Sequence, residues 1–274
     1  MSSLKSSLGY DRDNKVHRML WMLFVVVVSL TALVLIWWFI SIVIDRPMVP
    51  TPAETWGALT ELARDGDPMT GRTLWTYIRS SFGTFMKGFA LAFVVAFPLG
   101  LLLGYSGVIR EFATPAIEVL RPIAPVAWAP VFVVLFGYQI GPMVVVFVGI
   151  FFPLLTSVIF GVRKIDPNWI DAAKTLGASQ LQIFAKVVIP ASIPYLMNGV
   201  KVGLGIGWMC IVSAELYASP IGGVGFYISN QAFVGYWPGV FAGIFIVGVL
   251  GIITVGTADY LHRTLSKRMG VEVS

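Results

Sequence analysis

Apolar residues fall in long, uninterrupted runs along the chain, and short polar stretches separate these runs. The run Met22–Ile44 has no charged residue and as an α-helix would be about 34 Å long, enough to cross a bilayer. It is longer than the apolar part of a signal peptide and no small-residue cleavage pattern follows it, so we expect it to remain as an anchor. Five further runs are predicted to span the membrane: Phe82–Gly104, Ile123–Phe136, Pro142–Gly161, Tyr195–Leu216 and Gly239–Ala258.

The pattern therefore predicts an all-α integral membrane protein with six transmembrane helices, the first of which packs at the periphery. The third predicted span, Ile123–Phe136, is short and contains Pro125 and Pro130. A proline removes a backbone hydrogen bond and kinks a helix, so this span needs cover from neighbouring helices.

Composition supports the membrane assignment: 57% of the residues are hydrophobic, only 12% are charged, and the mean hydropathy is +0.83. Soluble domains carry roughly twice that share of charged residues. The net charge of +5 does not indicate a nucleic-acid partner, because the basic residues are dispersed beside the apolar runs. Cys210 is the only cysteine, which excludes an intrachain disulfide and argues against a thiolate metal site.

Both ends of the chain are basic, which predicts their orientation. Cytoplasmic segments are enriched in Lys and Arg, so we expect cytoplasmic tails at residues 1–21 and 263–274 and hence an even number of spans. The basic residues of these ends are Lys5, Arg12, Lys15, Arg18, Arg263, Lys267 and Arg268. Six spans also put Arg110, Arg121, Arg163, Lys164, Lys174, Lys186 and Lys201 inside, and leave outside only Arg46, Arg64, Arg72, Arg79 and Lys87. The prediction is a multi-pass protein of the cytoplasmic (inner) membrane.

Two outer segments are long enough to have structure of their own. In residues 45–77, Thr51 and Glu54 are spaced as a capping box around Pro52. The helix that follows carries apolar residues at Trp56, Leu59 and Leu62; either it lies along the membrane interface or the segment is a simple connector. The glycine- and aromatic-rich stretch 218–237 either lies at the interface or folds back toward the pathway.

The cytoplasmic loop at residues 163–194 is predicted to hold two short, capped helices. Asp166 is a good N-cap, Pro167 suits the first helical position, and Gly177 suits a left-handed C-cap. A second capping box, Ser179 with Gln182, begins the next helix, which we expect Pro190 to end.

The first of these helices presents a mixed face. Trp169 and Ile170 lie beside the small residues Ala172 and Ala173, so the helix could insert into a groove on another protein. The alternative is that the loop folds back onto the ends of its own helices.

At these residues the chain resembles a known family. Asp171-Ala172-Ala173, then Gly177, then Ile189-Pro190 is similar to the "EAA" loop of ABC-importer permeases, with Asp in place of the usual Glu. More specifically, three stretches resemble the nitrate/sulfonate/taurine/bicarbonate branch, and together they extend the likeness from Pro50 to about Arg268: PTPAETWGALTEL (Pro50–Leu62), RPIAPVAWAPVFVVLFG (Arg121–Gly137) and NGVKVGLGIGWMCIVSAEL (Asn198–Leu216).

The resemblance implies a type I ABC importer permease with a permease core at 78–262, paired with a second copy of itself. ABC ATPase subunits, which use ATP and Mg, would dock at the cytoplasmic face, and an external solute-binding protein would deliver the solute. The chain would carry no cofactor and would not be an enzyme. Members of the branch carry nitrate, taurine, alkanesulfonates, bicarbonate or thiamine precursors, so we expect a small anion. The implied ATPase-coupling residues are Trp169, Ile170, Asp171, Ala172, Ala173 and Gly177.

Inside the predicted spans, a few residues are candidates for the pathway or for packing. Trp128, Pro130 and Trp208 belong to the resembling motifs and either line the passage or simply pack. Glu215 lies near the outer end of its span and is predicted to act as a gate or to make a structural bond at a helix end. The stripe Gly199, Gly203 and Gly207 predicts close helix packing, within the subunit or at a homodimer seam.

Other chemistries find little support. The stretch GDPMTGRT (residues 66–73) has P-loop spacing but Arg replaces the lysine, and no predicted strand precedes it. His17 and His262 lie at opposite ends of the chain and predict neither a metal site nor a catalytic triad. A transporter or channel that works alone would need an intramembrane network of charged residues, which the spans lack. The hypothesis of a membrane enzyme is also weakened, because the sequence shows no cluster of His, Asp or Ser.

Overall fold

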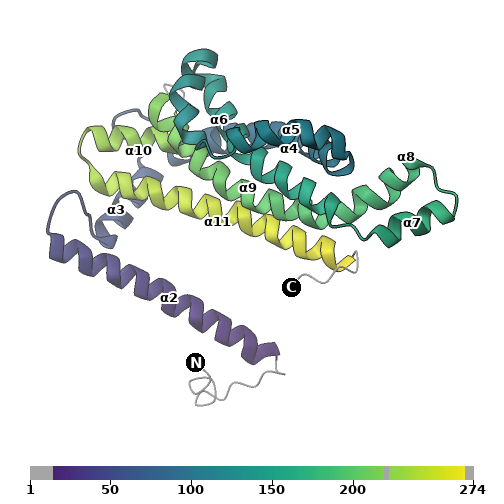
Figure 1. Cartoon of the computed structure of the whole chain (residues 1–274). Coiled ribbons are helices and arrows are strands. Elements are labelled where there is room, and N and C mark those ends of the chain that lie inside the picture. The colour runs from purple at the N-terminus through teal and green to yellow at the C-terminus, as the bar shows by residue number, and fades with distance from the viewer. Residues whose placement is uncertain (1–14, 219–221, 269–274) are drawn as a thin grey trace.

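The computed structural model describes residues 15–218 and 222–268, and within them every regular element is helical. Lys5 and Arg12 of the predicted N-terminal tail lie outside these residues. In chain order (Figure 1) the elements are α2 (Lys15–Ile44), α3 (Pro52–Arg64), α4 (Leu74–Tyr105), α5 (Gly107–Leu120), the 3₁₀ turn η1 (Pro125–Trp128), α6 (Ala129–Arg163), α7 (Pro167–Thr175), α8 (Gln180–Ile183), the π-helical turn η2 (Phe184–Val188), α9 (Ile189–Ala218), α10 (Val224–Phe233) and α11 (Trp237–Arg268).

Helices α4, α6 and α9 form the core of the bundle, and α11 packs along α9. Glycines let their backbones approach closely. A Cβ atom at Gly203 would come within 2.9 Å of the Ile150 side chain, and one at Gly199 within 2.7 Å of Ser157. Gly207 likewise faces Ile150 and Phe85. These three glycines therefore pack against helices of their own chain, the first of the two alternatives that their spacing predicts.

The third predicted span is not a separate helix. The segment Ile123–Phe136 contains part of a turn, η1 and the first limb of α6, and at Gly137 the backbone leaves helical geometry (φ 75°, ψ 172°). A Cβ atom at Gly141 would lie 2.7 Å from the Cα of Val133, so the chain reverses at Gly137 and the two limbs of α6 pack together. Only Gly accepts such a positive φ without strain. The described residues hold five helices long and apolar enough to span a membrane: Leu20–Ile44, Leu74–Tyr105, Pro125–Arg163, Gln180–Tyr217 and Trp237–Thr264.

The first helix is peripheral, as predicted. Helix α2 runs apart from the bundle in Figure 1, and its apolar residues are almost all exposed. It is tied to the rest at its outer end, where the Trp37 indole N–H donates to the Pro50 carbonyl (3.1 Å) and the ring stacks on Phe241. Exposed apolar surface of this extent suits a helix that faces lipid.

The outer segments are more ordered than predicted. The capping box of Thr51 and Glu54 is present at the start of α3. This helix buries Thr55, Ala58 and Leu62 and packs against α11, while Trp56 stays exposed. Neither a free interfacial helix nor a connector describes it, because the buried face follows the i, i+3, i+7 spacing of a packed helix. Helix α10 also folds back into the bundle, against α9 and α11.

Pro190 does not end the second loop helix, so that prediction is wrong. Helix α8 continues through η2 into α9, and Gln180–Tyr217 forms one long helix. In the π-helical turn the hydrogen-bond ladder shifts, as the Ile189 N–H donates to the Phe184 carbonyl five residues earlier. The widened turn lets the chain pass a proline near the start of α9 without a break.

Candidate functional site

Helix α7 is fixed at its start by local chemistry. The Asp166 side chain accepts a hydrogen bond from the Asn168 backbone N–H (2.9 Å), and Pro167 occupies the first helical position. An N-cap carboxylate and a preset φ satisfy the end of the helix and complement its dipole. Both features were predicted from the sequence.

The end of α7 is equally defined. Gly177 has φ +76°, its N–H donates to the Lys174 carbonyl (2.9 Å), and the Ala178 N–H donates to the Ala173 carbonyl (3.0 Å). This pair of bonds is a Schellman motif, which requires a left-handed residue. The nine-residue helix is therefore a short rod with both ends closed.

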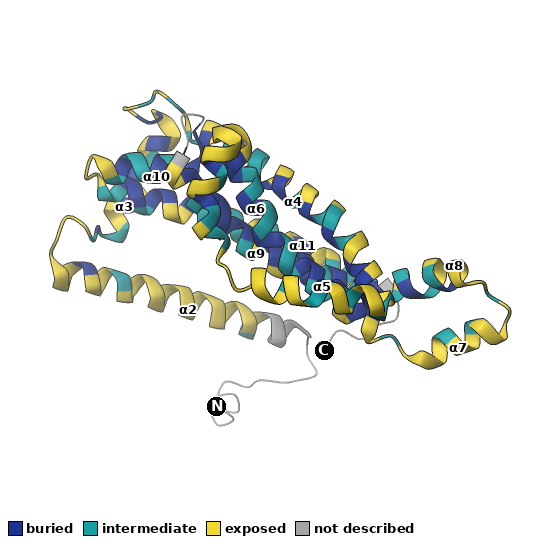
Figure 2. Ribbon diagram, turned by 45° about the horizontal axis from the view of Figure 1, so that its top comes forward, coloured by how far each residue is buried: buried dark blue, intermediate teal, exposed yellow. Residues whose placement is uncertain are grey.

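The rod projects away from the bundle instead of folding back onto it. Figures 1 and 2 show α7 at the far end from α3 and α10, with mostly exposed residues. None of its residues is buried, and Trp169 is 57% exposed. Asp171, Ala172 and Gly177 are exposed, whereas Ile170 and Ala173 are half-buried. The alternative of a loop folded on its own helix ends does not match this geometry.

Helix α8 ties the rod to two long helices of the bundle. Its capping box of Ser179 and Gln182 is present, as predicted. The Tyr105 hydroxyl at the end of α4 donates to the Gln180 side-chain oxygen (2.6 Å), and the Tyr105 ring meets Phe184 edge-on at 5.4 Å. Because α8 is also continuous with α9, α7 is linked through α8 to both α4 and α9. The Tyr105 contact was missed because two residues 75 positions apart leave no local signal.

At the opposite end of the bundle, Glu215 of α9 makes hydrogen bonds to both α4 and α10. It is 4% exposed, and its carboxylate accepts hydrogen bonds from the Ser81 hydroxyl (2.8 and 2.9 Å) and from the Gly225 N–H (2.9 Å). Ser81 in turn accepts from the Val224 N–H (2.8 Å). A carboxylate at the N-terminus of α10 satisfies its free N–H groups. This arrangement agrees with a structural bond at a helix end, one of the two predicted roles.

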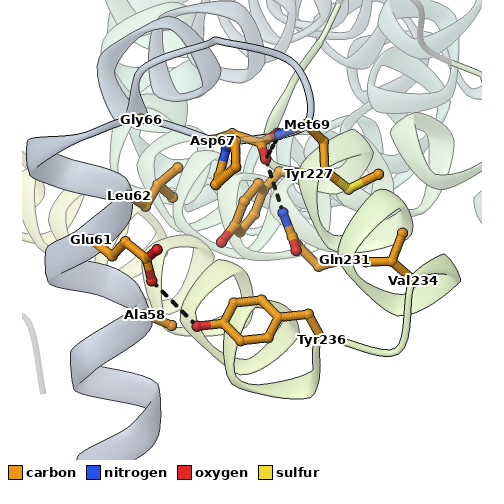
Figure 3. Close-up of a pocket in the computed structure, with 11 residues that line it drawn as sticks. Ala58, Glu61, Leu62, Gly66, Asp67, Met69, Tyr227, Gln231, Val234 and Tyr236 are labelled. Atoms are coloured by element: carbon orange, nitrogen blue, oxygen red, sulfur yellow. Dashed lines mark hydrogen bonds between the residues drawn. The ribbon is translucent and has the colours of Figure 1, made fainter.

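A second buried carboxylate organises the loop between α3 and α4. Asp67 is 1% exposed and accepts from the Tyr77 hydroxyl (2.6 Å), the Thr70 hydroxyl (2.7 Å) and the Gln231 amide (3.2 Å). Figure 3 shows Asp67 and Gln231 in a pocket of about 330 Å³ whose other wall includes Tyr236. This network lies in residues 66–73, the stretch with P-loop spacing. The glycines of that stretch therefore form a turn and do not form a phosphate-binding loop.

The predicted pathway residues do not come together. Trp208 is buried, stacks on Phe85 (4.7 Å) and donates to the Thr254 hydroxyl (2.7 Å), which favours packing. Trp128 is half-buried against Phe132, and Pro130 is exposed. In the part of the chain that the structure describes, no group of three or more His, Cys, Asp or Glu is placed to hold a metal.

Arg121 lies elsewhere than predicted. The sequence places it with the cytoplasmic cations, but it lines a pocket against the middle of α6 and α9, next to Gly149 and Ile206. The physical reason is that α5 follows α4 directly and the turn after α5 brings Arg121 to the bundle.

Residues 96–267 match the model of a protein family described as "Binding-protein-dependent transport system inner membrane component".

Named relatives agree with this match. The chain is 37% identical over 82% of its length to a putative ABC transporter permease protein of Methanocaldococcus jannaschii, of which it covers 85%. It is 29% identical over 87% of both chains to the taurine transport system permease protein TauC of Escherichia coli. It is also 29% identical to the bicarbonate transport system permease protein CmpB of Synechocystis sp., covering 68% of this chain and 67% of that one.

Solved structures support the fold. A structure of the MetNI methionine ABC transporter in an inward-facing conformation aligns with a TM-score of 0.59 at 19% identity, over 73% of this chain and 98% of the other. A bacterial ABC transporter that imports alginate aligns with a TM-score of 0.53 at 15% identity, over 91% and 98%. The chain belongs to the binding-protein-dependent transport system inner membrane component family, and it is a membrane-embedded ABC transporter permease subunit, not an enzyme.

Proposed function

We propose that the chain is the translocation subunit of an ATP-driven importer and that α7 is the helix through which partner ATPase subunits drive it. The observation that carries the proposal is the geometry of α7: a capped, outward-projecting rod with no buried residue. An exposed, stiff helix with Trp169 on its surface is suited to insertion into a groove. The ATPases would bind ATP and Mg; the permease would supply neither a cofactor nor the hydrolytic site.

The contacts behind α7 account for how a push is transmitted. Movement of the rod displaces α8, and α8 bears on Tyr105 of α4 and continues into α9. Both helices belong to the core of the bundle, so they move as packed bodies. The π-helical turn η2 lies on this route, at a place where a helix can change pitch with little loss of hydrogen bonds.

The partners and the cargo follow from the relatives. Because the relatives TauC and CmpB are named for taurine and bicarbonate transport, we propose a small anion as the solute, delivered by an external binding protein. A second copy of the chain would complete the passage. The basic ends, Lys15 and Arg18 at the start and Arg263 at the end, support cytoplasmic termini and a position in the inner membrane. With five spanning helices this needs a sixth crossing, and α5 together with the first limb of α6 would make it, because α4 and the second limb of α6 run parallel.

A pair of tryptophan variants tests the proposal. Trp169→Ala should abolish co-purification of the ATPase and ATP-driven uptake in proteoliposomes, because it removes the largest exposed side chain of α7. The matched control is Trp38→Ala in α2, since Trp38 is similarly exposed (50% against 57%) but far from the loop. Retention of ATPase binding and uptake in the Trp169 variant would contradict the proposal.

A further inference from the structure

A second pocket, of about 340 Å³, opens between α6 and α9 with a cation on its wall. Its polar side chains are those of Arg121, Thr156 and Ser157, and its floor includes Gly149 and Ile206. None of the residues implied by the family resemblance for coupling lies here, and the sequence assigned Arg121 to a cytoplasmic loop.

The pocket lies at mid-depth of the bundle, which two helices indicate independently. In α6, Gly149 is about 20 Å from the end of the helix at Arg163, counted at 1.5 Å per residue. In α9, Ile206 is about 25 Å from the start of the helix at Ile189 by the same count. Half of a hydrocarbon core is about 15 Å, so the floor of the pocket lies near the middle of the long helices, while Ser157 lies about 9 Å from the end of α6. Arg121, which is exposed on the single chain, borders this pocket, and an ionisable group beside membrane-spanning helices is a candidate for function.

Arg121 has no acidic partner in the described part of the chain. The ion pairs found there are Lys174 with Asp171, and Asp259 with Lys201 and Arg263, all in the inner half of the molecule or in the loop. A guanidinium in a low-dielectric site is costly unless an anion compensates it, and its planar fork suits an oxyanion. The donors of the Arg121 guanidinium are used by no other group of the described residues, so they are available to an oxyanion.

The hydroxyls of the pocket add a selective donor. Thr156 already donates to the Phe152 carbonyl of its own helix (2.9 Å), so its proton is used. The Ser157 hydroxyl has no hydrogen-bond partner among the described residues, which leaves its proton free for a ligand. A cation and a free O–H that line the same pocket offer donors to the oxygens of a carboxylate, sulfonate or similar group.

We propose that Arg121 and Ser157 form an anion subsite on the translocation path, through which the solute passes at mid-membrane. The inference rests on the proposed function and adds to it the residues that contact the cargo. The same chemistry would also bind the phosphate of a lipid headgroup. The subsite is one wall of the passage, and its openness on the single chain leaves the facing wall to a second copy.

The test uses the complete complex of permease, ATPase and binding protein in phosphatidylcholine vesicles, with radiolabelled taurine and bicarbonate as probes. Arg121→Gln should slow uptake about tenfold or more, the loss of one charge-assisted contact. Basal ATPase activity without solute and ATPase co-purification should be unchanged. Arg121→Lys should retain part of the uptake, and Ser157→Ala, a nearly isosteric change, should slow it severalfold. The control is Lys87→Gln, which removes a cation of α4 that is exposed and lines neither pocket.

The outcomes distinguish an anionic solute from a lipid headgroup as the ligand of Arg121. Uptake by Arg121→Gln equal to that by Lys87→Gln overturns the subsite while leaving the proposed function intact. A loss that appears only in vesicles made half of phosphatidylglycerol shows that Arg121 serves the headgroup of an anionic lipid, which also overturns the subsite. If the unsubstituted complex imports neither probe and ATP hydrolysis does not respond to the binding protein, the proposed function and the subsite both fail. If the Arg121→Gln variant does not assemble, the other two variants decide. Undiminished uptake by both Ser157→Ala and Arg121→Lys would overturn the subsite.

Discussion

The two ends of the bundle are built in opposite ways. At the outer end, α4, α9, α10 and the loop between α3 and α4 are joined by buried hydrogen bonds centred on Asp67 and Glu215. At the inner end, α7 has no buried residue and owes its shape to its own caps. Long-range contacts thus stabilise one end, and local sequence stabilises the other.

The difference teaches what each end can do. A network that spans several helices resists change at any single member, so the outer end moves as a unit. A rod that is stable by itself and touches the bundle through α8 can be grasped by another protein without disturbing the fold. The comparison predicts that substitutions at the outer end cost stability, whereas those in α7 cost coupling.

The largest loss of stability is expected for Asp67→Ala. It leaves Tyr77, Thr70 and Gln231 without their shared acceptor, and the free energy of unfolding should fall by about 3 kcal/mol or more. Thermal unfolding of the purified permease in detergent measures this. Asp65→Ala is the control, because Asp65 is exposed and only two residues away; equal melting temperatures for the two variants would break the comparison.

A smaller loss is expected for Glu215→Gln. The amide oxygen can keep the bond from the Gly225 N–H, but the NH₂ group then faces the Ser81 hydroxyl in place of an acceptor, so the free energy of unfolding should fall by about 1–3 kcal/mol. Glu111→Gln on the exposed face of α5 should leave the melting temperature unchanged. An unchanged melting temperature together with altered uptake in Glu215→Gln would instead favour the predicted gate.

Gly177→Ala tests the cap of the rod. Alanine at φ +76° should destabilise the end of α7 by about 1 kcal/mol, without a change in the melting temperature of the bundle. Faster hydrogen exchange of the α7 amides would report it. Gly205→Ala should have the opposite effect on stability. This helical glycine has open space around its Cβ position, so the substitution should raise the free energy of unfolding by about 0.5–1 kcal/mol.

The smallest effect on stability is expected for Asp171→Asn. The ion pair of Asp171 and Lys174 (3.0 Å) is exposed on both sides, so the free energy of unfolding should change by less than about 0.5 kcal/mol. A loss of ATPase binding in the same variant would show that this carboxylate contacts the partner. A large fall in melting temperature would contradict the view that α7 is independent of the bundle.

Local signals account for what the sequence predicted well. The caps at Thr51, Asp166 and Ser179 and the stop at Gly177 depend on neighbours two to five residues away, and all four are present. The long apolar runs likewise identify the spanning helices, because hydrophobic length needs no tertiary information.

Long-range geometry accounts for what it missed. The reversal at Gly137, the bond between Tyr105 and Gln180, and the mid-depth position of Arg121 all depend on segments that meet only in the folded chain. Pro190 misled for a related reason: in a packed membrane bundle a proline does not have to end a helix, as Pro98, Pro153 and Pro194 also show.

Cross-linking from the two ends of the bundle tests the central claim most directly. A photoreactive label on Ala172→Cys in α7 is compared with the same label on Ala53→Cys in α3, both exposed positions; the native Cys210 is buried and escapes labelling. The account predicts that membranes containing the full complex yield an adduct with the ATPase from position 172 and none from position 53. No adduct from position 172, or equal adducts from both ends, would contradict it.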